Sequence, residues 1–221
     1  MSAPDAELLR AEFLGITVRH DEHDTPRDQL AATFAAISER YDLTRMEYTD
    51  GGATLSGGAG SELVLRPGHT AAAGVTSLGF HEGLERVAGM LREGLARLEP
   101  GPLLAVEDIT LVAVWDLEHE DAARDYLTRE VLGLDPERQA LLASDDDDAS
   151  HGLRLWRSLG DGMLDVAVEP MHSDTSKLYL RLVYTDDNPI DEVDDVIERA
   201  EAVNQYLHGR LVAFICAGAP R

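Results

Sequence analysis

Two similar stretches lie about 96 residues apart in this chain, and the similarity constrains the fold more than any other feature of the sequence. The first covers residues 16–28 and the second covers residues 109–125. Each begins with an apolar segment typical of a strand, continues into an acidic turn that contains histidine, and then shows the spacing of an amphipathic helix. We therefore expect one structural unit to occur twice.

The patterns that follow the two stretches also run in parallel. Each half reads as strand, helix, three strands and helix, an order that places the helices on one face of antiparallel sheets. The segment Pro100-Gly101-Pro102 ends a helical pattern and is the best boundary between the halves, residues 1–102 and 103–221. The sequence predicts an α+β fold of two tandem pseudo-repeats that are related by a pseudo-two-fold axis. The two repeats could pack together as one compact unit.

Individual elements follow from periodicity and from turn residues. We expect helices near residues 5–13, 30–41, 84–98, 121–132 and 193–207. We expect strands near residues 16–19, 46–48, 63–66, 73–80, 109–115, 153–157, 163–169, 178–184 and 211–216. The run 109–115 is almost continuously apolar, which predicts a strand buried on both faces. The glycine-rich segment 51–60 lies between strand patterns and lacks the Gly-Lys-Ser/Thr ending of a phosphate loop, so we expect a flexible hairpin loop.

Charge and cysteine content narrow the function classes. The chain has 42 acidic and 19 basic residues, a net charge of −23, and Lys177 as its only lysine. Such a chain repels phosphate, so direct binding to nucleic acid or to an anionic membrane is disfavoured. Three explanations remain open: bacterial adaptation to salt or high GC content, a basic partner protein, or mimicry of nucleic-acid charge. The sequence shows no membrane span and no signal peptide, and Cys216 stands alone, so we expect a cytoplasmic protein.

The two acidic turns offer one candidate metal site. Imidazole and carboxylate groups from both turns could bind a transition metal between the halves, with His20, His23, Glu118 and His119 as ligands. The competing interpretation is structural, because acidic residues before a helix are favoured by its positive N-terminal end. The run Asp145–Asp148 lacks the alternating ligands of a calcium loop. We expect no metal and no cofactor.

One face of the predicted sheet in the second half offers a candidate binding site. Strand alternation directs leucines and valines toward the helices, so the residues between them point the other way. That outward set includes Arg154, Trp156, Tyr179 and Arg181. Tryptophan, tyrosine and arginine are the residue types enriched at interaction hot spots. An ordinary outer face held together by cross-strand ion pairs is the alternative.

The sequence favours a non-enzymatic binding or accessory protein. No Gly-x-Ser-x-Gly motif is present, and Cys216 lies in an apolar run, so nothing indicates nucleophilic catalysis. In bulk properties the chain is similar to small acidic chaperones and immunity proteins, which engage other proteins. Two alternatives remain: a metal-dependent or small-molecule enzyme with a site between the halves, and a nucleic-acid charge mimic. We expect the partner to be another protein, with a basic protein as one option.

Overall fold

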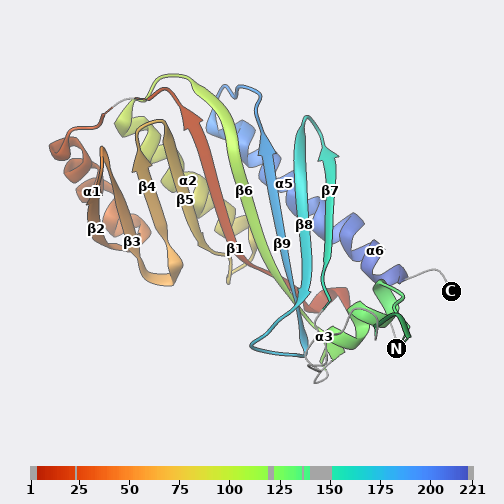
Figure 1. Ribbon diagram of the computed structural model, residues 1–221. Helices are drawn as coiled ribbons and strands as arrows, with labels where there is room; N and C mark the ends of the chain where they lie inside the picture. The colour runs from red at the N-terminus through yellow and green to blue at the C-terminus, as the bar shows by residue number, and fades with distance from the viewer. Residues whose placement is uncertain (1–3, 23, 119–121, 136, 140–150, 219–221) are drawn as a thin grey trace.

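The computed structural model describes residues 4–22, 24–118, 122–135, 137–139 and 151–218. Within them, strands form one antiparallel sheet in the order β2-β3-β4-β5-β1-β6-β9-β8-β7 (Figure 1). The strands are β1 Leu9–His20, β2 Leu43–Thr49, β3 Gly52–Gly57, β4 Glu62–Arg66, β5 His69–Val75, β6 Leu103–Asp116, β7 Leu153–Leu159, β8 Gly162–Pro170 and β9 Lys177–Asp186. The helices are α1 Arg27–Tyr41, α2 Phe80–Leu98, α3 Ala122–Asp125, α5 Val193–Tyr206 and α6 Val212–Ala217. The predicted mixed α+β class, with a large antiparallel sheet, is confirmed.

The long central pair β1–β6 joins the two halves of the chain into this single sheet. The two strands run antiparallel, with Leu9 opposite Trp115 at one end and His20 opposite Leu103 at the other. The strands β2 to β5 extend the sheet from β1, and β9, β8 and β7 extend it from β6. Backbone pairing is therefore continuous across the boundary near residues 100–102.

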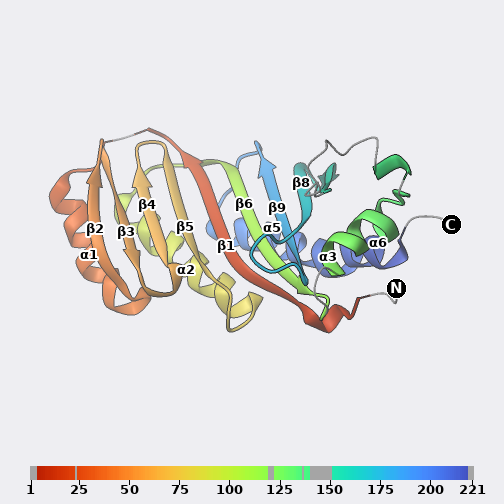
Figure 2. The same ribbon diagram turned by 60° about the horizontal axis from the view of Figure 1, so that its bottom comes forward.

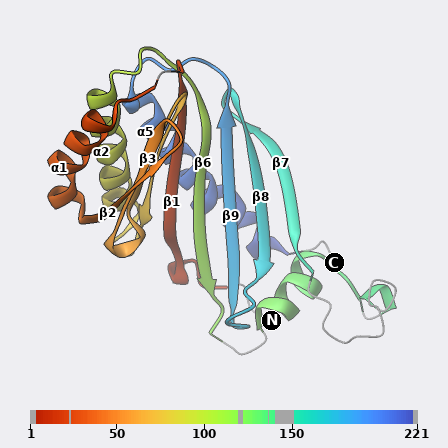
Figure 3. The same ribbon diagram turned by 60° about the vertical axis from the view of Figure 1, so that its left-hand side comes forward.

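The core lies between the sheet and the helices α1, α2 and α5, which cover one face of it (Figure 2). Alternate strand residues such as Leu14, Leu111 and Leu180 are fully buried. Val87 and Leu91 of α2 are also fully buried, and α2 packs on β1 and β5. Burial of each such side chain contributes about 1.5–3 kcal/mol. The view in Figure 3 shows these helices together on one side of the strands.

Both ends of the chain differ from the prediction. The segment expected as a helix over residues 5–13 is a 3-10 turn, Ala6–Leu8, followed by the start of β1. The Trp115 indole Nε1 donates to the Asp5 carbonyl at 2.7 Å, and β1 pairs with β6 from Leu9 onward. The segment 211–216, expected as a strand, is helical: α5 continues through a π-helical turn, Leu207–Leu211, into α6. Long-range pairing of β1 with β6 decides the first case, and packing of α6 on the segment Tyr126–Val131 decides the second.

The glycine-rich segment is also not the expected loop. Residues 52–57 form β3, so the helix α1 is followed by four strands rather than three. The glycines allow the backbone to approach its neighbours closely. A Cβ atom at Gly57 would lie 1.8 Å from the Asp42 carbonyl oxygen, and one at Gly52 would lie 2.0 Å from that of Leu65. Glycine is therefore required here for close packing rather than for mobility.

Gly57→Ala is expected to reduce the free energy of unfolding by about 1–3 kcal/mol, because the β2–β3 backbone must move to admit the methyl group. Gly209→Ala is the matched control, because a Cβ atom at Gly209 meets nothing within 4 Å. Urea unfolding followed by circular dichroism measures both variants. Equal stability of the two would contradict the close-packing explanation.

Candidate interaction face of the sheet

The face of the sheet opposite α1, α2 and α5 is the candidate site, and we call it the open face. Its central strands show no covering helix in Figure 1. Strand β6 alternates between fully buried residues on the helix side and partly exposed residues on the open face. The prediction that this strand is buried on both faces is therefore wrong. Its apolar outward residues, Val112 and Val114, lie at the middle of the open face.

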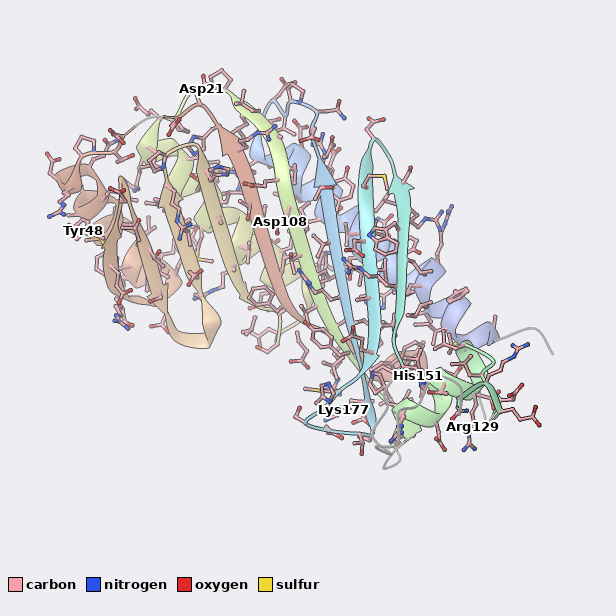
Figure 4. The ribbon with its side chains drawn as sticks, in the orientation of Figure 1. Asp21, Tyr48, Asp108, Arg129, His151 and Lys177 are labelled. Carbon is pink, nitrogen blue, oxygen red and sulfur yellow. The ribbon has the colours of Figure 1, made fainter. Side chains whose placement is uncertain are left out.

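Pairing register places a row of apolar side chains across the sheet. Val112 lies opposite Phe13 of β1, and Phe13 lies opposite Val75 of β5. Val183 of β9 lies on the same face and is also partly exposed. Antiparallel sheets with one solvated face usually present polar residues there. The open face departs from that pattern at its centre, although Asp108 lies within it (Figure 4).

All four predicted binding residues lie on the open face. Arg154 and Trp156 come from β7, and Tyr179 and Arg181 come from β9. Ala167 of β8 lies between Arg154 and Arg181, so the two arginines belong to one cross-strand row. The structure thus brings the four residues to one region, with β8 between the pairs.

Trp156 is the most exposed aromatic residue of this region, at 63%. The Arg154 guanidinium carbon lies 4.9 Å from the centre of its ring. The same guanidinium donates to both carboxylate oxygens of Asp165, from Nε at 3.1 Å and from Nη2 at 2.7 Å. This hydrogen bonding lowers the pKa of Asp165 and raises that of Arg154. Asp165 therefore holds the Arg154 guanidinium beside the indole ring.

Several charged residues of the open face form ion pairs. Arg19 lies 3.6 Å from Asp187, Arg45 pairs with Glu47, and His69 contacts Glu107. Arg154 pairs with Asp165 as described above. Each exposed pair contributes little to stability. Together they offset part of the charge on this face in a chain with a net charge of −23.

Arg154→Ala is expected to leave the unfolding midpoint unchanged and to alter the fluorescence of Trp156, because the pair is exposed and only its contact with the indole is lost. Trp115 is fully buried and serves as the internal reference. Emission spectra with and without acrylamide quencher separate the two tryptophans. A large loss of stability would show that the pair has a structural role instead.

The candidate metal site is not assembled from the two turns. Because β1 and β6 are antiparallel, the ends that lead into the turns lie at opposite ends of the sheet. Asp21, next to His20, and Lys177, next to the end of β6, mark these two ends in Figure 4. The separation along the strands is roughly 40 Å at 3.3 Å per residue. His20 and Glu118 therefore cannot share one ion, and His23 and His119 lie outside the described residues.

His20, the one histidine of the two turns that the structure describes, forms hydrogen bonds within the protein. His20 is 2% exposed, with Nε2 at 3.0 Å from the Thr70 hydroxyl and Nδ1 at 2.9 Å from the Asp21 carbonyl oxygen. Among the residues that the structure describes, no group of three or more histidine, cysteine, aspartate or glutamate side chains could hold a metal ion. The acidic run Asp145–Asp148 lies outside this part of the chain.

Sequence reasoning did not identify the central apolar residues of the open face. Phe13 falls in the segment expected as a helix, and Val112 falls in the strand expected to be buried on both faces. The sequence showed that the segment around Val112 is an apolar strand, but it did not show which strands pair with it. Only the strand order shows that no helix covers the outward side of β1 and β6.

Comparison with known proteins adds little to this site. No family model and no curated protein matches the chain. A chain in the crystal structure of A. aeolicus tRNASec in complex with M. kandleri SerRS is similar at 16% sequence identity and a TM-score of 0.39. The match covers 94% of this chain and 31% of that chain. A likeness at this level carries no argument about function.

A search of the described helices for membrane spans finds none that is long and apolar enough to cross a bilayer.

Proposed function

We propose that the chain is a non-enzymatic, cytoplasmic accessory protein that binds another protein on the open face of its sheet. The observation that carries the proposal is the apolar row across the uncovered strands, represented by Phe13, Val75 and Val112. Apolar side chains on one exposed surface mark interaction sites more often than isolated ones do. The chain would act in the manner of a chaperone-like or immunity-like interaction module.

The residues at the β7 side of the open face support the same proposal. Trp156 offers a large exposed ring beside the Arg154 guanidinium, which Asp165 holds in place. A rigid aromatic side chain loses little conformational entropy on binding, which favours it as an anchor. Tyr179 and Arg181 lie two strands away and extend the same surface.

Charge distribution also favours the open face over the rest of the surface. Arg19, Arg45 and Arg154 of this face pair with acidic residues, which reduces the charge that a partner meets there. The stretch 186–201 between β9 and the middle of α5, by contrast, contains eight acidic residues and one arginine, Arg199. An acidic partner would therefore be repelled mainly at this stretch, which includes the start of α5. The open face can therefore accept a partner of mixed charge.

The two other candidate functions gain no support. An enzyme with a metal between the two turns would need His20 and Glu118 near one another, and the sheet separates them. A nucleic-acid mimic would need carboxylates aligned on one face and free of cations, whereas three carboxylates at the open face pair with Arg19, Arg45 and Arg154. The first hypothesis of the sequence analysis therefore remains the proposal.

We also propose that residues 1–102 and 103–221 descend from one duplicated unit. The proposal is supported by the way each half contributes its first strand, β1 or β6, to the centre of the sheet. In each half a helical segment follows that strand, then an antiparallel run of strands, then a long helix, α2 or α5. Among the described residues the halves differ in strand number, with four strands after α1 and three after α3.

Site-specific photocrosslinking in living cells tests the binding proposal. A photoreactive phenylalanine analogue is placed at Val112 on the open face and, as the control, at Ala36 on the exposed side of α1. We expect a discrete crosslinked species from position 112 and none of equal intensity from position 36. The same species from both positions, or none from 112 at any expression level, would overturn the proposal. An adduct of two copies would identify the chain itself as the partner.

A further inference from the structure

A second surface lies on the opposite side of the molecule, between the C-terminal part of α2 and the start of α5. Here the two helices leave a groove with a volume of about 530 Å³. Its floor is apolar and is formed by Leu95, Ala96, Pro100, Leu103 and Val193. The groove occurs where α2 and α5 approach each other near the loop that leads into β6 (Figure 1).

The rim of this groove is acidic. Arg92 of α2 pairs with Asp194 of α5 at this groove, with Nη2 at 2.5 Å from Oδ1, and so neutralises one carboxylate. Glu99 and Glu192 also line the groove. Within the part of the chain that the structure describes, neither of these glutamates has an ion pair. The start of α5 adds Asp191 and Asp195 nearby, so the local charge remains negative.

The apolar floor and the acidic rim together define the kind of ligand. Aliphatic side chains at helical spacing, i and i+3 or i+4, would fill the groove in the way that a helix fills a groove between two others. Lysine or arginine on either side of them would face Glu99 and Glu192. A purely polar segment would leave the apolar floor of the groove exposed. An acidic segment would in addition be repelled by the acidic rim.

We propose that this groove binds a basic amphipathic segment of a partner protein. The groove lies on the helix side of the sheet, so its ligand is separate from whatever occupies the open face. Charge complementarity is the reason for choosing this occupant, because the rim is negative and the whole chain carries −23. A small neutral apolar molecule is the alternative occupant, and the test below distinguishes it.

Fluorescence anisotropy with a labelled synthetic peptide tests the proposal on the full chain. The probe is a short helix-forming peptide with leucines on one face and lysines on the other, and its reference is a peptide of the same composition in scrambled order. We expect the amphipathic peptide to bind about tenfold more tightly than the scrambled one, since only the former presents its leucines together. Binding should weaken as salt is added.

Two variants locate the site. Ala96→Trp fills the groove from an exposed helix position without a change in charge, and Ala36→Trp makes the same substitution on the exposed side of α1. We expect Ala96→Trp to weaken peptide binding about tenfold, the loss typical of a blocked anchor pocket, and Ala36→Trp to have no effect. Circular dichroism confirms that both variants fold.

Three results would overturn the proposal. Equal affinity for the amphipathic and scrambled peptides would show that only net charge is sensed. Equal effects of Ala96→Trp and Ala36→Trp would place the binding elsewhere. The third result uses the uncharged fluorophore 1-anilinonaphthalene. If the groove binds this fluorophore in preference to the peptide, and if the binding is lost in Ala96→Trp and unaffected by salt, the groove binds small apolar molecules instead.

Discussion

Asp186→Ala is expected to reduce the free energy of unfolding by about 3–5 kcal/mol, the cost of removing one partner from a buried ion pair. The Asp186 side chain is 1% exposed and lies 2.8 Å from Nε of Arg199. It also accepts hydrogen bonds from the Tyr184 hydroxyl at 3.2 Å and from the backbone and side chain of Asn188 at 2.9 and 2.7 Å. The substitution leaves the Arg199 guanidinium without its partner at the junction of β9 and α5.

Asp187→Ala is the matched control for this prediction, because the neighbouring side chain is 98% exposed. Urea unfolding of the two variants and of the unchanged chain gives the comparison. We expect Asp187→Ala to behave as the unchanged chain does. A similar small effect for both variants would show that the Asp186 contacts contribute nothing beyond an ordinary surface charge.

The same carboxylate predicts a dependence of stability on pH. Burial alone would raise the pKa of Asp186, but the hydrogen bonds from Asn188 and Arg199 outweigh burial, so the pKa lies below its ordinary value. A carboxyl with a lowered pKa in the folded state stabilises the fold above its unfolded pKa of about 3.9, and this contribution is lost as the pH falls through the folded value. Acid unfolding should therefore be less steep in Asp186→Asn, as measured by circular dichroism against pH.

Replacing the aromatic anchor and one central valine of the open face is expected to have the largest effect on partner binding. Trp156→Ala should weaken binding at least about thirtyfold, which corresponds to a hot-spot loss of roughly 2 kcal/mol. Val112→Asp places a charge at the centre of the apolar row and should abolish binding, because the buried carboxylate would have no partner. Biolayer interferometry with the crosslinked partner measures both.

Stability controls separate this effect from unfolding. Both side chains lie on the open face, and Trp156 is 63% exposed, so neither substitution removes a core residue. Ala36→Asp provides a charge of the same sign on the other side of the molecule. Loss of binding in all three variants, or in none of them, would refute the assignment of the partner to the open face.

The fold class could be predicted because the local patterns in the second half are clear. Strands β8 and β9 alternate regularly between buried and outward residues, and the turn at Gly160 to Gly162 joins β7 to β8 as expected. The long helix begins at Val193, where acidic residues cap it. In these regions local propensity and tertiary packing agree, so the sequence pattern is sufficient.

The missed elements have one physical cause: non-local contacts decide them. By composition, the apolar run 211–216 fits a strand or a buried helix equally well. Its packing on the π-helical turn Tyr126–Val131 selects the helix. The Tyr126 hydroxyl donates a hydrogen bond to the Ile215 carbonyl of this run. Gly52 and Gly57 suggested a loop, because the sequence does not show that the backbone of Leu65 lies close to Gly52 and that of Asp42 close to Gly57.

The candidate site was predictable only in part, for the same reason. Alternation alone placed Arg154, Trp156, Tyr179 and Arg181 on one face, and the structure agrees. The pairing of β1 with β6 could not be predicted, because it depends on contacts between residues far apart in the chain, from 83 positions for His20 and Leu103 to 106 for Leu9 and Trp115. That pairing creates the apolar centre of the open face and also separates the two histidine-bearing turns.

Cross-saturation NMR of the complex tests the central claim most directly. With alanine methyl groups labelled in this chain and the partner irradiated, the methyls of Ala71, Ala73 and Ala167 report on the open face, and those of Ala32 and Ala36 report on the exposed side of α1. We expect attenuation of the first set and full intensity in the second. Attenuation at Ala32 and Ala36, with Ala71, Ala73 and Ala167 unaffected, would contradict the assignment of the binding site.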